Sequence, residues 1–263
     1  MMERIPVFLA AQSKYGKPVM PLPLDRGVPE FSYKSSGKPK NGDHTIYLLG
    51  DGKPFTVDVG VITSNSSPVS VSFETVKGKQ LCRGWLKPDK AKLANCRITV
   101  DPAPEGVYVL KVRRNLNSLR IRSRVKQSSP AGTIYSYAGG GSYVFEVPQS
   151  GILEWKCRPS LAVYPVFAAL ESPDGKITNC RFYAPRDGKE RRFRVKAAPG
   201  LWKLSGIFAP MPSNLKVNRV PVKYLAPSRE KYFNPDKVTC DNAENAAAKY
   251  EVLKYKSFNK SRR

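Results

Sequence analysis

Basic side chains that alternate with apolar ones along several short segments are the residues of this sequence best suited to bind a ligand. Successive side chains of an extended strand point to opposite faces, so cations two positions apart share one face. Such a face would attract a polyanion, for example an acidic or sulfated polysaccharide, lipopolysaccharide or nucleic acid. The alternative is a solvated outer sheet face that happens to be basic. The cations in this pattern are Lys111 and Arg113, then Arg120, Arg122, Arg124 and Lys126, and finally Arg192, Arg194 and Lys196.

Only one of the three tryptophans has the sequence context of an exposed ring. A tryptophan ring can stack on the apolar face of a sugar. Trp155 alternates with Leu153, and Trp202 lies in an apolar closing strand, so both patterns favour the core. Trp85 lies near the end of a strand-like run, beside a Lys-Pro step. We therefore expect Trp85 to be the candidate for sugar stacking.

The sequence has no arrangement of residues typical of a catalytic, cofactor or metal site. His44 is the single histidine, so any site that needs two is excluded, and we expect it in a loop. No Gly-x-Ser-x-Gly motif is present, and the glycines at 139–141 lack the Lys-Ser/Thr of a phosphate-binding loop. Asp58 and Glu146 are expected to face solvent rather than to form a glycosidase-like pair. The sequence thus predicts a protein that is not an enzyme and has no cofactor or metal.

The five cysteines leave two interpretations open. None of them forms a Cys-x-x-Cys motif, which argues against a zinc ribbon or a thioredoxin-like site. In an oxidising compartment, Cys82 with Cys96 and Cys157 with Cys180 would form disulfides, leaving Cys240 free. In a reducing compartment all five would be buried thiols that pack as small hydrophobic side chains.

Length and charge restrict the protein class. The 263 residues are 41% hydrophobic and carry a net charge of +24, enough apolar content for a core and a strong preference for anionic surroundings. The basic residues are spread along the chain rather than gathered in a tail. No apolar run approaches the roughly 20 residues of a membrane-spanning helix. Residues 1–12 hold only a short apolar patch interrupted by Pro6, which is not a convincing signal peptide.

An internal repeat organises the chain. Residues 45–59 align without a gap with residues 133–147, since both begin with Thr-Ile-Tyr and continue through a Gly-rich turn. Further on, a Gly-Lys pair at 78–79 corresponds to one at 175–176. Turns at 102–106 and 197–200 then precede closing strands at 107–112 and 201–204. Landmarks in one order at similar spacing predict two copies of one unit.

Each copy is expected to be all-β. Short runs rich in Val, Ile, Tyr, Phe and Thr alternate with turn residues, which is typical of an immunoglobulin-like or jelly-roll-like sandwich. The expected strands of the first copy are 45–49, 54–63, 68–76, 80–86, 94–100, 107–114 and 118–126. Those of the second copy are 133–137, 142–148, 151–157, 164–171, 177–183, 190–196 and 201–208.

The predicted organisation is a pair of tandem sandwich domains with distinct ends. The segments are a proline-rich extension at 1–44, copy 1 at 45–127, copy 2 at 133–225, and a C-terminal helix with a basic tail at 226–263. A linker is expected at 128–132. The helix would start at Asp241 or Asn242 and run to about Tyr255.

The second copy also carries motifs of a known family. Residues 143–148 read Tyr-Val-Phe-Glu-Val-Pro, residues 173–176 read Pro-Asp-Gly-Lys, and the closing strands read Val-Tyr-x-Leu and Leu-Trp-x-Leu. This pattern resembles the bacterial pre-peptidase C-terminal domains and related β-sandwiches appended to secreted glycoside hydrolases, best over residues 133–208 and less well over 45–126. The first copy has Val-Gly where the family has Val-Pro. The resemblance implies a non-catalytic module, at the cell surface or outside the cell, that contacts carbohydrate, attaches to a surface or acts as a spacer.

The sequence therefore predicts a non-catalytic accessory or surface β-sandwich protein that contacts polysaccharide or another anionic surface. It could also be a non-catalytic fragment of a larger secreted hydrolase. The alternative is a basic nucleic-acid-associated or virion-type structural protein, which would bind DNA or RNA with a steep dependence on salt.

Overall fold

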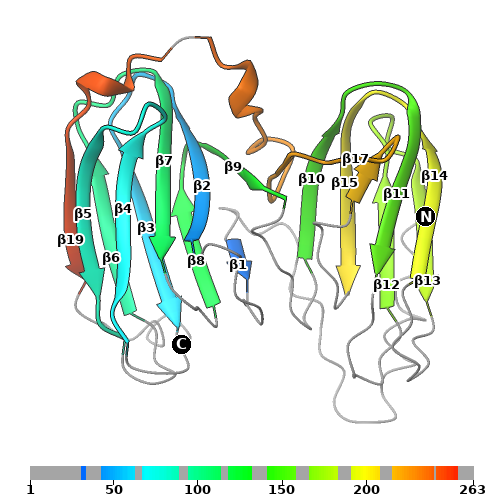
Figure 1. Cartoon of the computed structure of the whole chain (residues 1–263), viewed down its shortest axis with the longest axis horizontal. Helices are drawn as coiled ribbons and strands as arrows, with labels where there is room; N and C mark the ends of the chain where they lie inside the picture. Colours follow the sequence, from blue (N-terminus) through cyan, green and yellow to red (C-terminus); the bar gives the residue numbers. More distant parts are fainter. Residues whose placement is uncertain are drawn as a thin grey trace, which may run out of the picture.

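The computed structural model describes residues 31–33, 43–62, 67–88, 94–113, 118–131, 141–157, 166–182, 191–207, 215–239 and 241–253. Within these ranges the chain forms antiparallel strands, two 3-10 helices and no α-helix, so the predicted all-β class is confirmed. Figure 1 shows the strands gathered in two stacks that lie side by side.

The first stack, which we call the first sandwich, consists of two antiparallel sheets. One has the order β1 (Phe31–Tyr33), β8 (Ser118–Ser123), β3 (Phe55–Ile62), β6 (Ala94–Val100) and β19 (Ala248–Leu253). The other has the order β18 (Tyr224–Leu225), β9 (Lys126–Pro130), β2 (Asp43–Gly50), β7 (Gly106–Arg113), β4 (Val69–Thr75) and β5 (Gln80–Leu86).

The second stack, the second sandwich, is built from two smaller sheets. One has the order β10 (Gly141–Val147), β15 (Gly200–Ile207), β12 (Val166–Glu171) and β13 (Ile177–Phe182). The other has the order β14 (Arg191–Ala197), β11 (Gly151–Cys157), β16 (Leu215–Val217) and β17 (Val220–Pro221).

The two sandwiches repeat one strand order. The order β2-β7-β4-β5 in the first corresponds to β10-β15-β12-β13 in the second, and β8-β3-β6 corresponds to β16-β11-β14. By this correspondence β10 is the partner of β2. The gap-free alignment of 45–59 with 133–147 is therefore wrong by one strand, because it placed β3 opposite β10. The equivalent of β3 is β11.

The other landmarks of the sequence repeat are equivalent in the structure. Gly78 and Gly175 both have positive φ, at 91° and 83°, in the hairpins β4–β5 and β12–β13. Each glycine N–H donates to the carbonyl three residues earlier, at 3.0 Å. Tyr108 and Trp202 lie on the closing strands β7 and β15, and each donates to a backbone carbonyl four residues upstream. The Tyr108 bond has the form of the tyrosine corner found in other sandwiches.

Alternation of apolar and polar residues places the core between the sheets. Along β3, Phe55, Val57 and Val59 are at most 3% exposed. The Phe55 ring contacts Tyr108 from the opposite sheet, with 5.4 Å between ring centroids. Burying each such side chain stabilises the fold by about 1.5–3 kcal/mol.

The C-terminal segment forms a strand instead of the predicted helix. A 3-10 helix, η4, covers only Ala243–Asn245, and β19 then pairs antiparallel with β6. Helix propensity of an alanine-rich run is a weak effect that tertiary pairing overrides. Tyr250 packs against the core, and its ring lies directly over Gly84 of β5. The chain thus returns from the second sandwich to complete the edge of the first.

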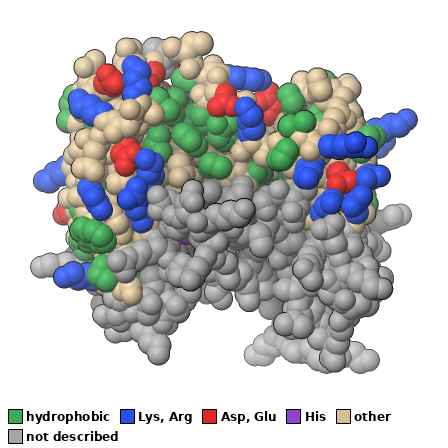
Figure 2. Space-filling model, in the orientation of Figure 1, with side chains coloured by type: hydrophobic (Ala, Val, Ile, Leu, Met, Phe, Trp, Pro, Cys, Tyr) green, Lys and Arg blue, Asp and Glu red, His purple; other side chains and the backbone are tan. Residues whose placement is uncertain are grey.

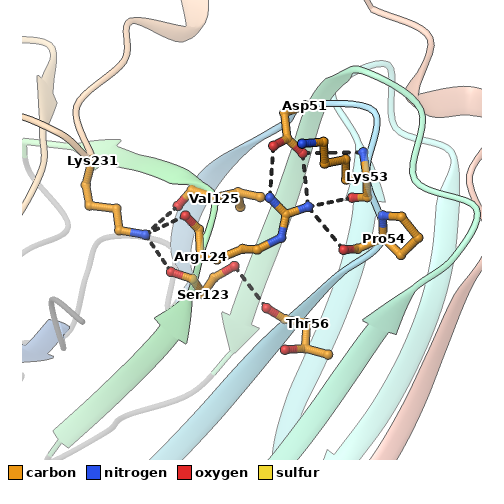
Figure 3. A network of polar contacts seen from close by, with 8 residues as sticks. All are labelled: Asp51, Lys53, Pro54, Thr56, Ser123, Arg124, Val125 and Lys231. Atoms are coloured by element: carbon orange, nitrogen blue, oxygen red, sulfur yellow. Dashed lines mark hydrogen bonds and ion pairs between the residues drawn. The ribbon is translucent and has the colours of Figure 1, made fainter. Parts of the chain in front are cut away.

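The segment between the sandwiches is also structured. β9 covers most of the predicted linker and pairs with β2 and β18. The Lys231 ammonium donates to the carbonyls of Ser123 and Arg124 at 2.7 Å and to that of Val125 at 3.2 Å, as Figure 3 shows. These three residues carry the chain from β8 to β9, which belong to different sheets. A second 3-10 helix, η3 (Pro235–Lys237), follows.

Most of the predicted N-terminal extension lies outside the described residues, apart from β1 and the first two residues of β2. The division of the chain into domains stays a prediction. No helix in the described ranges is both long and apolar enough to cross a membrane.

Candidate functional site

Three of the predicted site residues, Trp85, Lys111 and Arg113, come together on the outer face of the first sandwich. They lie on β5 and β7, on either side of β4. In the strand register, Ser70 lies between Arg113 and Trp85, and Ser72 lies between Lys111 and Arg83. On the face drawn in Figure 2, Lys and Arg side chains surround an acidic one over the left-hand strands. We call this surface the Trp85 face; its residues are Ser70, Ser72, Glu74, Gln80, Arg83, Trp85, Lys111 and Arg113.

The Trp85 face is a polar depression with an aromatic ring beside it. Six of its residues line the depression: Ser70, Ser72, Glu74, Gln80, Arg83 and Arg113. The Trp85 side chain is 46% exposed, and the Arg83 guanidinium lies over its ring at 5.4 Å from the centroid. Arg83 Nε also donates to Ser70 Oγ at 3.3 Å. One face of the indole thus carries a cation, and nearly half of the side-chain surface is open to solvent.

Glu74 is the acidic side chain of this depression, and it is held as a carboxylate. Lys111 Nζ donates to Glu74 Oε2 at 2.5 Å, and Ser72 Oγ donates to Oε1 at 3.0 Å. Burial alone would raise the pKa of Glu74, but these hydrogen bonds outweigh it and keep the pKa below its ordinary value. By register, Asp43 of β2 lies opposite Arg113. The exposed guanidinium groups of Arg83 and Arg113 border the depression.

This arrangement suits the recognition of an acidic sugar. The exposed tryptophan offers an apolar platform for a sugar ring. A guanidinium group binds a carboxylate or sulfate through charge-assisted, bidentate hydrogen bonds. Gln80 and the two serine hydroxyls supply neutral donors and acceptors of the kind that fix a sugar hydroxyl.

Arg120 and Arg122 lie on the outer face of the other sheet of the first sandwich, where charges alternate. Asp58 lies between Arg122 and Arg97 in the register, and Glu251 of β19 lies beyond Arg97. Arg97 makes two hydrogen bonds to the Asp58 carboxylate, at 2.7 and 3.0 Å. Cross-strand pairs of opposite charge stabilise a sheet. The row is therefore charge-balanced, and Arg120 and Lys249 lie on the same face outside it.

The expectation that Arg120, Arg122, Arg124 and Lys126 share one face is wrong. The chain leaves one sheet after Ser123 and enters the other at Lys126, so the strand alternation stops between them. Arg124 instead binds both oxygens of Asp51, at 2.9 and 3.1 Å, as well as two backbone carbonyls. This contact lowers the pKa of Asp51 to about 2, chiefly through the hydrogen bond from Arg124. The role of Arg124 in the structure is to close a turn (Figure 3).

Arg192, Arg194 and Lys196 do share one face, as predicted, on β14 of the second sandwich. Two cations that sequence reasoning missed lie on the same outer face: Lys156 opposite Arg192 on β11, and Lys216 opposite Glu154 on β16. The right-hand end of Figure 2 shows an acidic side chain ringed by Lys and Arg side chains. We call this surface the β14 face; its residues are Ile152, Glu154, Lys156, Arg192, Arg194, Lys196 and Lys216.

Glu154 is the one carboxylate among the described side chains of the β14 face. It accepts a hydrogen bond from Arg194 Nε at 2.8 Å and lies 3.7 Å from Arg192 Nε and 3.9 Å from Lys156 Nζ. The hydrogen bond from Arg194, with the charges around it, keeps the pKa of Glu154 below its ordinary value. The alternation of Glu154 with Lys156 was visible in the sequence. Lys216 lies on a three-residue strand that has no pattern to detect.

The cysteine pairing predicted for the first copy is absent from the structure. Cys82 and Cys96 are both free thiols, on facing sheets of the sandwich. Burial raises their pKa values to about 11 and about 12. The side chains of Cys157 and Cys180, and all of Cys240, lie outside the described residues. Both described cysteines are reduced thiols, and Cys96 is buried whereas Cys82 is only half-buried.

Of the remaining candidates, Trp155, Trp202 and His44 are buried, and Glu146 is half-buried. Trp155 is fully buried and Trp202 is 5% exposed, as the sequence predicts. His44 lies within β2 and is buried, whereas the sequence placed it in a loop. Glu146 also departs from its predicted exposure, because Asn234 and Lys237 donate to its carboxylate. Among the described side chains, no group of three or more His, Cys, Asp and Glu is placed to hold a metal ion.

Comparison with known proteins gives no relative: no family model, no curated protein and no solved structure matches this chain.

Proposed function

We propose that this protein is a non-catalytic β-sandwich protein that binds an acidic polysaccharide on the Trp85 face. The observation that carries the proposal is an exposed tryptophan beside a polar depression that two arginines and two serines line. The resemblance to carbohydrate-associated sandwich modules supports the same ligand class. The net charge of the protein, +24, favours an anionic polymer over a neutral one.

The roles of the residues follow from their positions. Trp85 stacks on a pyranose ring, while Arg113 and Arg83 bind the carboxylate or sulfate of the same or the next sugar. Glu74 holds Lys111 by an ion pair and accepts a hydrogen bond from Ser72. Glu74 therefore positions the polar floor of the site, and it does not need to contact the sugar.

Retention on immobilised glycans tests the proposal. The full chain is passed over hyaluronan, alginate and polygalacturonate, with neutral dextran as the comparison. We expect retention on at least one acidic glycan. Trp85→Ala and Arg113→Gln should each weaken it about tenfold, the loss of one stacked ring or one charge-assisted contact. Val220→Ala, which trims an apolar side chain that is 63% exposed on β17, serves as the control and should bind normally.

Two results would contradict the proposal. The first is a lack of retention on every acidic and neutral glycan. The second is retention that is unchanged in both Trp85→Ala and Arg113→Gln. Binding of single-stranded DNA that depends on Trp85 would favour the nucleic-acid alternative instead, because exposed aromatic rings also stack on bases.

A further inference from the structure

The β14 face concentrates positive charge that its own residues do not neutralise. It presents five cations around one carboxylate, namely Arg192, Arg194, Lys196, Lys156 and Lys216 around Glu154. The side chains of Arg192 and Arg194 are 47% and 57% exposed. On the equivalent face of the first sandwich, Asp58 and Glu251 alternate with Arg122 and Arg97. That face also carries Arg120 and Lys249, so it has four cations for two carboxylates, whereas the β14 face has five cations for one. The excess of positive charge is thus larger on the second copy.

The positions of Arg192 and Lys156 show that the excess positive charge lowers the stability of the sheet. Arg192 lies directly opposite Lys156 in the register, whereas the equivalent pair in the first sandwich is Asn95 opposite Gly60. Like charges directly opposite each other on neighbouring strands destabilise a sheet. Glu154 lies within 4 Å of both side chains and offsets part of this repulsion, and a bound anion would offset more of it.

The geometry of the face indicates the kind of ligand. Its cations lie on neighbouring strands about 4.8 Å apart and at alternate positions about 7 Å apart along a strand. This spacing presents rows of charges to a polymer with several anionic groups per unit length. The described side chains of the face include no aromatic ring on which a base could stack. The apolar side chain on the face is Ile152, which is 43% exposed.

We propose that the β14 face is a second binding surface, for a sulfated polysaccharide, separate from the Trp85 face. The choice of a polysaccharide rests on the proposed function, while the charge of the ligand rests on the β14 face itself. Arg192, Lys196, Lys156 and Lys216 bind sulfate groups, and Arg194 remains paired with Glu154. Binding here is electrostatic, so it weakens steeply as the salt concentration rises.

Heparin binding by matched variants tests this surface independently of the first. The starting protein carries Trp85→Ala and Arg113→Gln, which disable the Trp85 face. We expect this protein to retain heparin affinity, and the affinity to fall by about two orders of magnitude between roughly 50 and 200 mM salt if four sulfates are neutralised. Adding Arg192→Gln and Lys196→Gln should weaken heparin binding at least tenfold. The control adds Arg120→Gln and Lys249→Gln, which remove the same charge from the equivalent face of the first sandwich and should change binding less than twofold.

Thermal unfolding shows whether each variant is folded and gives a second readout. Heparin should raise the midpoint of the starting protein and of the control, but not that of the Arg192→Gln/Lys196→Gln protein. Equal losses of affinity in that variant and the control would overturn the proposal, because total charge alone would then determine binding. Absence of heparin binding by the starting protein would also overturn it and would leave the Trp85 face unaffected. Duplex DNA that binds the β14 face more tightly than heparin would replace the polysaccharide with a nucleic acid.

Discussion

Arg194 on β14 donates to Glu154 on β11 at 2.8 Å, and the same ion pair recurs in the first sandwich as Arg97 on β6 and Asp58 on β3. The two pairs occupy equivalent places in the repeated strand order. Around Asp58 a second acidic residue continues the row, whereas around Glu154 only cations do. One repeated ion pair therefore lies in a charge-balanced row in one copy and in a row of cations in the other.

The edge closed by β19 predicts a specific coupling between Tyr250 and Gly84. A Cβ atom at Gly84 would lie 2.1 Å from the Tyr250 ring, so Gly84→Ala forces the two sheets apart there. We expect Gly84→Ala to reduce the free energy of unfolding by about 1–3 kcal/mol, the usual cost of overpacking. In urea unfolding, the double variant Gly84→Ala/Tyr250→Ala should be more stable than the sum of the single changes predicts. Strict additivity would mean that β19 does not pack on β5.

The carboxylate of Glu74 predicts how stability depends on pH. Its pKa is lower in the folded state than the ordinary 4.5, so its stabilising effect is present above 4.5 and is lost as the pH falls through the folded value. Urea unfolding from neutral to acidic pH should show a loss of stability below 4.5 that is smaller in Glu74→Gln. At neutral pH the variant should be less stable by about 1 kcal/mol, because Lys111 loses its partner. Parallel pH profiles of the two proteins would contradict this assignment.

The contacts of Lys231 predict how strongly the crossover from β8 to β9 is held within the first sandwich. Lys231→Met removes the donor that satisfies three carbonyls where the chain passes between sheets. Carbonyls left without this donor should reduce the free energy of unfolding by about 1–3 kcal/mol. The matched control is Lys223→Met, since the Lys223 side chain is 73% exposed and pairs with Asp236 at 2.9 Å. An equal effect of both changes in chemical unfolding would contradict a special role for Lys231.

The free thiols of the first sandwich predict slow chemical modification. With pKa values of about 11 and about 12, Cys82 and Cys96 hold at most about one thiolate per thousand at pH 8. We expect iodoacetamide to modify them in the native protein at least a hundredfold more slowly than in urea. Peptide mass spectrometry resolves each site. A Cys82–Cys96 disulfide in the purified protein, or rapid native modification of both, would contradict the structure.

The strands were predictable from the sequence because a half-buried strand needs a two-residue alternation, which short windows reveal. β11, for example, has the bounds expected from the alternation of Leu153 and Trp155. Which residues become neighbours on adjacent strands was not predictable. Ser70 meets Arg113 and Trp85 only through long-range pairing of β4 with both neighbours, and that pairing leaves no local signal.

Two predictions, the C-terminal helix and the continuous strand at 118–126, are wrong for the same physical reason. In both places contacts with distant residues determine the structure, and the local sequence pattern does not. The alanine-rich segment before Tyr250 favours a helix by propensity, yet this part of the chain pairs with the open edge of β6 as a strand. The alternation through Arg120, Arg122 and Arg124 continues in the sequence, although the chain changes sheets after Ser123. Neither event is visible in a window of ten residues.

Protection of Trp85 from a neutral quencher tests the central claim most directly. Trp155 is fully buried and Trp202 is 5% exposed, so acrylamide quenching of the native protein reports mainly on Trp85, which is 46% exposed. Titration with acidic oligosaccharides from hyaluronan, alginate or polygalacturonate should reduce this quenching in a saturable manner, and Arg113→Gln should require at least tenfold more ligand. Neutral dextran oligosaccharides should have no such effect. If no acidic oligosaccharide shields Trp85 at any concentration, the Trp85 face is not a site for acidic polysaccharide.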